Sequence, residues 1–175
     1  MVNLKRFMRK RESWPRFASK VALVLGLMAG VGAAAGSRYS IAYDPQEVSC
    51  IEEYDLYLVD HGDTEMVRGG LYAFESGVLE PFYKESRPLI KYLEGMPGDQ
   101  VEINADQQVL VNGQFVTYGL HLSEKMKREP TSFMGKGQLS DNQYWMLGTS
   151  HESFDSRYWG AARKEQVIGR VYPIL

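Results

Sequence analysis

The chain has 175 residues, 44% of them hydrophobic, which suffices for one folded domain and a short additional segment. Its net charge of −2 conceals a basic head: residues 1–20 hold seven Lys or Arg and one acid, and the other 155 residues hold 13 basic and 21 acidic residues. One cysteine excludes an internal disulfide, and the three histidines lack metal-ligand spacing. With no P-loop or dinucleotide fingerprint either, we expect no cofactor and no metal.

The basic head, 1–20, runs directly into an uncharged apolar segment, 21–37. This segment predicts a transmembrane anchor or, as the alternative, a cleavable signal segment with Ala33-Ala34-Ala35 as its cut site. Because basic residues stay on the cytoplasmic side of a membrane, residues 38–175 are expected to be exported. Membrane lipid is therefore an expected partner of the chain, and nucleic acid is not.

The rest of the chain predicts short β-strands and little helix. We expect strands at 54–60, 69–76, 87–95, 101–103, 109–111, 114–116, 143–150 and 165–175. The sequence Met-Pro-Gly-Asp at 96–99 predicts a turn, and Asn-Gly at 112–113 predicts a hairpin. The polar segment 119–137 is expected to be a loop insertion. The predicted fold is mostly β, a coiled antiparallel sheet or barrel-like domain at 38–175, preceded by one transmembrane helix.

Lys91 interrupts an apolar strand just before the predicted 96–99 turn. Lysine is rarely buried without a partner or a task, so Lys91 either faces solvent or serves chemistry. Burial disfavours an ammonium ion, and a neutral lysine can act as the base that activates a serine. Ile90 and Leu93 are expected to provide an apolar wall beside it.

Ser49 is the candidate nucleophile, because it follows the expected span closely and could meet a membrane-bound substrate there; the alternative is an ordinary linker serine. Further along, Ser153, Asp155 and Arg157 alternate, so on an extended segment they would point to one side. They predict either a structural Asp–Arg ion pair or a group that orients a buried lysine amine by hydrogen bonds.

Three blocks together resemble the signal peptidase I superfamily, the S26 Ser-Lys peptidases, and within it the conjugative-transfer (TraF-type) signal peptidases. The blocks are the serine after the span, "IKYLEGMPGD" around the lysine, and "SFDSRYWG" near the C-terminus. The resemblance implies that Ser49 is the nucleophile and Lys91 the general base. It also implies supporting and substrate-binding positions: Asp155, Ser153 and Arg157 for support, and Glu47, Val48 and Ile90 for substrate.

The function that the resemblance implies is a membrane-anchored serine endopeptidase of the bacterial inner membrane, single-pass, with its catalytic domain facing the periplasm. Its expected partner is an exported precursor, a pilin or another component of a conjugative transfer system, together with other transfer-apparatus proteins. Glu47 and Glu52 beside the serine favour an alternative, a catalytically inactive scaffold or assembly factor of the same machinery. A second alternative makes Cys50 the nucleophile. The apolar span disfavours a soluble self-cleaving repressor of the same superfamily.

Overall fold

One helix and one β domain make up the part of the chain that the computed structural model describes, residues 13–44, 50–77 and 85–175. The chain divides into two units at the end of the helix, between Arg38 and Tyr39. Glu47, Val48 and Ser49 lie outside the described residues. The roles expected of these three residues therefore remain predictions.

Helix α1 (Trp14–Arg38) contains the whole apolar segment expected at 21–37 and begins before it. It carries no acidic residue and is rich in Ala, Gly, Leu and Val, and none of its side chains is buried. Its 25 residues extend about 37 Å, more than the roughly 30 Å of a bilayer core. By length and hydropathy α1 qualifies as a membrane span.

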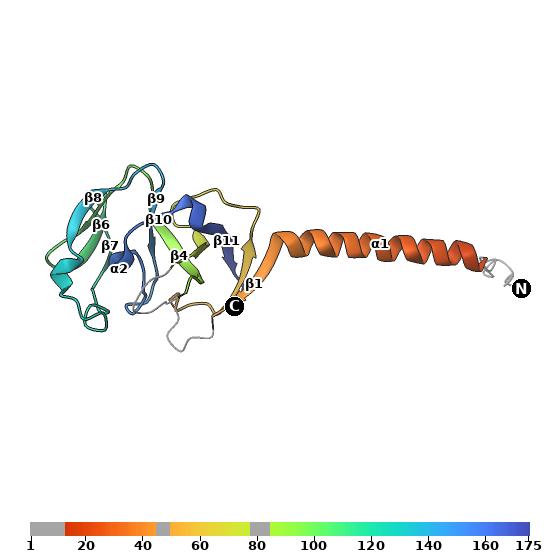
Figure 1. The fold of residues 1–175 in the computed structure, drawn as a ribbon, viewed down its shortest axis with the longest axis horizontal. Coiled ribbons are helices and arrows are strands. Elements are labelled where there is room, and N and C mark those ends of the chain that lie inside the picture. The colour runs from red at the N-terminus through yellow and green to blue at the C-terminus, as the bar shows by residue number, and fades with distance from the viewer. Residues whose placement is uncertain (1–12, 45–49, 78–84) are drawn as a thin grey trace, which may run out of the picture. The chain divides into compact units, whose positions relative to one another are not determined.

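The β domain contains eleven strands and short helical turns among its described residues (Figure 1). Its strands are β1 (Tyr39–Tyr43), β2 (Leu56–Asp60), β3 (Leu71–Glu75), β4 (Pro88–Gly95), β5 (Gln100–Ile103), β6 (Gln108–Val111), β7 (Gln114–Tyr118), β8 (Gly135–Gln138), β9 (Gln143–Leu147), β10 (Ala162–Arg163) and β11 (Val167–Pro173). Its helices are η2 (Pro130–Ser132), α2 (Ser156–Trp159) and η3 (Lys164–Gln166). The mostly β fold predicted from the sequence is confirmed.

The strands form two antiparallel sheets. The large sheet has seven strands in the order β1-β2-β11-β3-β4-β9-β10, and the small sheet has four in the order β7-β6-β5-β8. Figure 1 shows β6, β7 and β8 gathered at one end of the domain and β1 and β11 at the other. Strand β4 of the large sheet leads through a tight turn into β5 of the small sheet, and β8 of the small sheet leads back through residues 139–142 into β9 of the large one.

That joining turn has the geometry expected for Met96-Pro97-Gly98-Asp99. The Asp99 N–H donates to the Met96 carbonyl at 3.0 Å, and Gly98 has a positive φ of 85°. The Asp99 carboxylate accepts from the Met96 N–H at 2.6 Å, from Arg68 at 2.6 Å and from Asn112 at 2.7 Å. Burial raises the pKa of Asp99, but these hydrogen bonds outweigh it and hold the pKa below its ordinary value. The turn is therefore held in place by an ionised carboxylate.

Alternation along the central strands of the large sheet buries side chains on both faces. In β3, Tyr72 and Phe74 join one hydrophobic cluster, whereas Leu71 and Ala73 join another. A strand buried on both faces must be nearly continuous in apolar residues, as β3 is. The small sheet buries one face, through the valines and isoleucine of β5 and β6.

Several elements differ from the sequence expectations, among them β1, β8 and α2. Strand β1 occupies the segment directly after α1 and pairs with β2, where no strand was predicted. Strand β8 occupies the end of the expected 119–137 insertion and pairs with β5, although its Gly-Lys-Gly-Gln sequence has low β propensity. Tertiary pairing fixes both strands. The third difference, helix α2, concerns the site and is described below.

Candidate active site

Lys91 lies in the middle of β4, and alternation turns its side chain to a buried face of the large sheet. Leu89, Lys91 and Leu93 take successive positions on that face and are 6%, 0% and 0% exposed. Leu89 and Leu93 belong to one hydrophobic cluster, so apolar side chains flank the lysine. The solvent-facing alternative for Lys91 is wrong. Leu89, rather than Ile90, shares its face with Leu93.

The Lys91 amine has no hydrogen-bond partner among the described residues. Moving an isolated ammonium ion from water into an apolar interior is strongly unfavourable, whereas a neutral amine is tolerated far better. A buried lysine whose amine has no competing acceptor or counter-charge is the arrangement that general-base catalysis by lysine requires.

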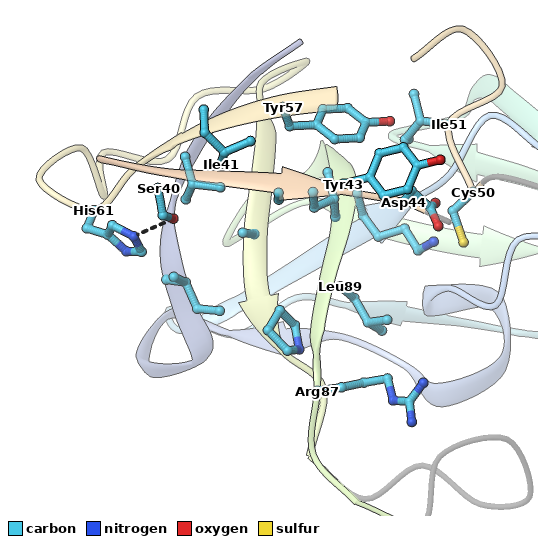
Figure 2. A pocket seen from close by; sticks show the side chains of 17 residues that line it. Ser40, Ile41, Tyr43, Asp44, Cys50, Ile51, Tyr57, His61, Arg87 and Leu89 are labelled. Atoms are coloured by element: carbon cyan, nitrogen blue, oxygen red, sulfur yellow. Dashed lines mark hydrogen bonds between the residues drawn. The ribbon is translucent and has the colours of Figure 1, made fainter. Parts of the chain in front are cut away.

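A cavity of about 600 Å³ opens beside Lys91 (Figure 2). Strand β1 forms one wall, β4 and Arg87 form another, and β2, β3 and β11 contribute to the rest. Ile90 lines the cavity, although it packs with the cluster on the opposite face of β4 from Lys91. Its substrate contact stays a prediction.

The two described residues that flank the segment 45–49 both line this cavity. They are Asp44, at the end of β1, and Cys50. The Cys50 carbonyl accepts hydrogen bonds from the backbone N–H of Thr149 at 3.0 Å and of Ser150 at 3.4 Å. The chain immediately after Ser49 is therefore fixed to the loop that follows β9.

The end of that loop and the helix α2 that follows it contain a fully buried ion pair. Arg157 and Asp155 are 2% and 0% exposed, and the guanidinium donates to the two carboxylate oxygens at 2.8 and 2.7 Å. Arg157 also donates to the backbone carbonyls of Tyr118, Gly119, Ser150 and Ser153. Burial lowers the pKa of Arg157. The hydrogen bonds and negative charge of Asp155 have the larger, opposite effect, so the pKa lies above its ordinary value. The structural Asp–Arg pair predicted from the sequence is present.

Asp155 stands at the beginning of a helix, which the expectation of an extended segment missed. Its Oδ1 accepts from the Arg157 N–H at 3.2 Å, as an N-cap of α2, and its Oδ2 accepts from the Gly148 N–H at 3.1 Å. An Asp followed by helical residues is a capping signal that the sequence offered. Asp155 therefore has its acceptors occupied by Arg157 and the backbone.

Ser153, in contrast, is buried with an unpartnered hydroxyl. It is 1% exposed, and its Oγ has no hydrogen-bond partner among the described residues. A Cβ placed on Gly148 would lie 2.2 Å from that oxygen and 2.6 Å from the Cys50 carbonyl oxygen. Ser153 thus fills the space directly above Gly148.

The strand register relates Ser153 to Lys91. Tyr92 pairs with Leu147 in the antiparallel β4–β9 ladder, so the next position along places Lys91 opposite Gly148. Opposed residues in an antiparallel pair project to the same face. The Ser153 hydroxyl and the Lys91 side chain therefore occupy the same face of the sheet, and each carries a buried polar atom without a partner among the described residues.

The cavity wall on β1 was missed by the sequence interpretation. At this wall Ser40 Oγ lies 2.8 Å from His61 Nε2, as Figure 2 shows. Along β1, Ile41 and Tyr43 alternate with the small residues Ser40 and Ala42. This aromatic and β-branched pattern directly after the apolar run was the signal that could have predicted the strand. Among the described residues, no group of three or more His, Cys, Asp or Glu is placed to hold a metal ion.

Comparisons with known proteins give one consistent family. The family described as "Signal peptidase, peptidase S26" matches residues 21–175. A protein of Synechocystis sp. named "Probable signal peptidase I-2" is 34% identical over 85 residues, which cover 47% of this chain and 36% of that protein. A "Signal peptidase I" of Leptolyngbya laminosa is 30% identical over 83 residues, covering 46% of this chain and 37% of that protein.

The matches thus span little more than a third of the length of these two curated relatives. A crystal structure of a signal peptidase I from Enterococcus faecalis V583 superposes with a TM-score of 0.39 at 22% identity. That superposition covers 62% of this chain and 98% of the solved one.

Proposed function

Because this chain belongs to the peptidase S26 signal peptidase family, we propose that it is a serine endopeptidase with a Ser49–Lys91 dyad. The observation that carries the proposal is the buried amine of Lys91, unpartnered among the described residues and lining a cavity. Cys50, the residue after Ser49, lines the same cavity. Ser49 is therefore one position in sequence from a residue that lines the cavity of the candidate base.

The proposed reaction proceeds through an acyl-enzyme. Ser49 Oγ attacks the scissile carbonyl carbon while neutral Lys91 takes the hydroxyl proton, and the resulting ammonium passes that proton to the departing amine. Water then attacks the ester, Lys91 accepts a proton from it, and Ser49 regains its proton as the acid is released. Backbone N–H groups, that of Ser49 included, would stabilise the oxyanion.

Ser153 is the proposed positioning residue for the base. Its hydroxyl shares the face of Lys91, and no described residue satisfies either polar atom. A hydrogen bond from the Ser153 hydroxyl to the neutral amine would hold the nitrogen lone pair in a fixed direction. Asp155 and Arg157 support the loop instead, because their polar groups are used by each other and by the backbone.

We further propose that α1 anchors the enzyme in the bacterial inner membrane as a single span, with the β domain facing the periplasm. The support is the apolar length of α1 and the basic residues that precede it. The proposed substrate is an exported precursor, a pilin or another conjugative-transfer component, since "SFDSRYWG" and "IKYLEGMPGD" resemble the conjugative subgroup. The enzyme would meet such a precursor at the membrane surface.

The alternative is an inactive scaffold of the same machinery, favoured by Glu47 and Glu52 on either side of Ser49. A carboxylate near the oxyanion would oppose the negative charge that develops there. A covalent probe separates the two functions: a penem that acylates Ser49 should add its mass to the active enzyme and not to a scaffold.

The deciding experiment is processing of a pilin-like precursor coexpressed with the chain, read by intact mass. Mature product should form with the wild type and with Cys50→Ala, and should disappear with Ser49→Ala. Equal processing with and without Ser49 would reject the dyad, and loss of processing only with Cys50→Ala would assign the nucleophile to the cysteine. A product short by one water would show that its own amine resolved the acyl-enzyme.

A further inference from the structure

A second, separate cavity lies between the small sheet and β9. It measures about 270 Å³ and shares no lining residue with the cavity at Lys91. Its lining is mainly apolar and includes β5, β8, β9 and the chain after α2: Val101, Ile103, Gly137, Leu139, Trp145 and Ala161. The proposed peptidase chemistry does not use this cavity.

The cavity exists because two rows of apolar side chains end in glycine. Val111 and Val101 are opposed across β6 and β5, and the next residue in that row is Gly137 of β8. The parallel row runs from Val109 through Ile103 to Gly135. The four apolar members of the two rows are at most 6% exposed. The buried face of the small sheet therefore continues to β8 and lacks side chains there.

The space above the two glycines is open. A Cβ on Gly135 or on Gly137 would have no heavy atom within 4 Å. Gly137 also lacks the positive φ of Gly135, so a side chain at Gly137 would cause no backbone strain. Neither steric crowding nor backbone conformation explains the glycine at position 137.

The adjacent edge of the sheet is also open. β8 is the last strand of the small sheet, no described strand pairs with its outer edge, and all four of its residues are exposed. Lys136, the charged residue of β8, lies on the opposite face and pairs with Glu102 at 3.0 Å. Proteins usually block such edges because they pair with any extended chain. The β8 edge is therefore available to one.

One residue of the cavity lining also carries a buried hydrogen-bond donor. Trp145 lines the cavity, and its indole Nε1 is buried without an acceptor among the described residues. An unsatisfied buried donor destabilises a protein by about 1–3 kcal/mol. A segment bound in the cavity would contact this tryptophan, so its indole N–H serves as a local probe of occupancy.

We propose that the groove bounded by β8 and Trp145 is a second substrate-binding site, which takes an extended segment of the precursor as an added strand on β8. This inference rests on the proposed peptidase function, which supplies an exported polypeptide as the ligand. A strand paired with the β8 edge places alternate side chains on the face of Gly135 and Gly137, where they complete the two apolar rows. The polar residues of the cavity lining, Gln138 and Gln143, are uncharged, so the segment that fits it alternates apolar and uncharged residues.

Two variants of β8 test the site in the full chain in detergent micelles. Gly137→Val fills the groove, and Lys136→Val adds the same side chain on the opposite face. The substrates are a short peptide around an Ala-x-Ala cut and the same peptide followed by a flexible linker and Thr-Val-Thr-Val-Thr. Gly137→Val should raise KM for the extended peptide about tenfold, the loss expected for one apolar side chain in a pocket. It should leave kcat and the short peptide unchanged, and Lys136→Val should leave both substrates unchanged.

The site is rejected if Gly137→Val leaves KM unchanged for both peptides, or raises KM equally for both. It is also rejected if Gly137→Val changes self-association on sedimentation, because the β8 edge would then bind a second copy of the chain. A binding measurement separates this proposal from the dyad. In Ser49→Ala, the Thr-Val-Thr-Val-Thr peptide should shift the ¹⁵N–¹H resonance of the Trp145 indole, assigned with Trp145→Phe. If the wild type cleaves neither peptide, the peptidase proposal fails, and an unshifted indole resonance rejects the groove independently.

Discussion

Two buried basic residues, Lys91 and Arg157, lie close to the same loop and have opposite surroundings. Each is at most 2% exposed. Arg157 donates to a buried carboxylate and to four backbone carbonyls, whereas the Lys91 amine has no partner among the described residues. A buried charge that is fully paired acts as a structural element, and a buried amine left unpaired is available for proton transfer.

Replacing Lys91 should give the largest effect of the substitutions that test this comparison. Lys91→Met keeps the length and apolar stem of the side chain and removes the amine. Peptide cleavage should fall by about 100- to 10,000-fold, the usual contribution of a general base, with melting temperature unchanged or raised. The control is Lys136→Met, an exposed lysine, which should cleave normally. Full activity of Lys91→Met would show that another group is the base.

Breaking the Arg157–Asp155 ion pair should mainly reduce stability. Asp155→Asn leaves the buried Arg157 guanidinium without its counter-charge, so the free energy of unfolding should fall by about 3–5 kcal/mol. Urea denaturation measures this free energy. The control is Glu152→Gln in the exposed Lys125–Glu152 pair, which should leave the unfolding midpoint unchanged. A loss of rate with unchanged denaturation would place Asp155 in the chemistry.

Ser153 lies between these two cases, because it is buried like Asp155 and unpartnered like Lys91. Ser153→Ala should lower kcat about tenfold, the value of one hydrogen bond, and should leave the melting temperature unchanged. Ser153→Thr should keep more activity than Ser153→Ala, because it retains the hydroxyl. Wild-type kcat in Ser153→Ala would remove the serine from the positioning role.

The smallest effect is expected at Asp99, which holds a turn and has no role in the proposed chemistry. Its pKa is lowered in the folded chain, so its ionised form adds stability above the unfolded pKa of about 3.9, and this is lost as pH falls through the folded pKa. The melting-temperature difference between wild type and Asp99→Asn should therefore shrink from about pH 6 to about pH 3. A difference that grows in acid would contradict the lowered pKa.

The sequence was informative where local chemistry alone determines structure. The Met96–Asp99 turn and the hairpin at Asn112-Gly113 follow from residues that favour positive φ, and the structure has Gly98, Asn112 and Gly113 there. The apolar alternation of β2, β4 and β11 was equally readable. In these segments the local preference and the tertiary environment agree.

Elements fixed by partners distant in sequence were less predictable. Strand β8 has two glycines and is defined by pairing with β5, and β1 by pairing with β2. The burial of Lys91 could be suspected from its apolar neighbours. Whether its amine finds a hydrogen-bond partner depends on how Ser153 and the loop after β9 pack in three dimensions. No single sequence contains such long-range geometry.

Gly148 has a consequence for how this sequence can vary over time. Any other amino acid at this position would bring its Cβ within 2.2 Å of Ser153 Oγ and 2.6 Å of the Cys50 carbonyl oxygen. Every amino-acid change at codon 148 would therefore crowd Ser153 and the chain that leads out of Ser49 at the same time. Under the proposed mechanism, one substitution at Gly148 would affect both the positioning serine and the nucleophile segment, whereas a substitution at Gly137 would affect only the proposed groove.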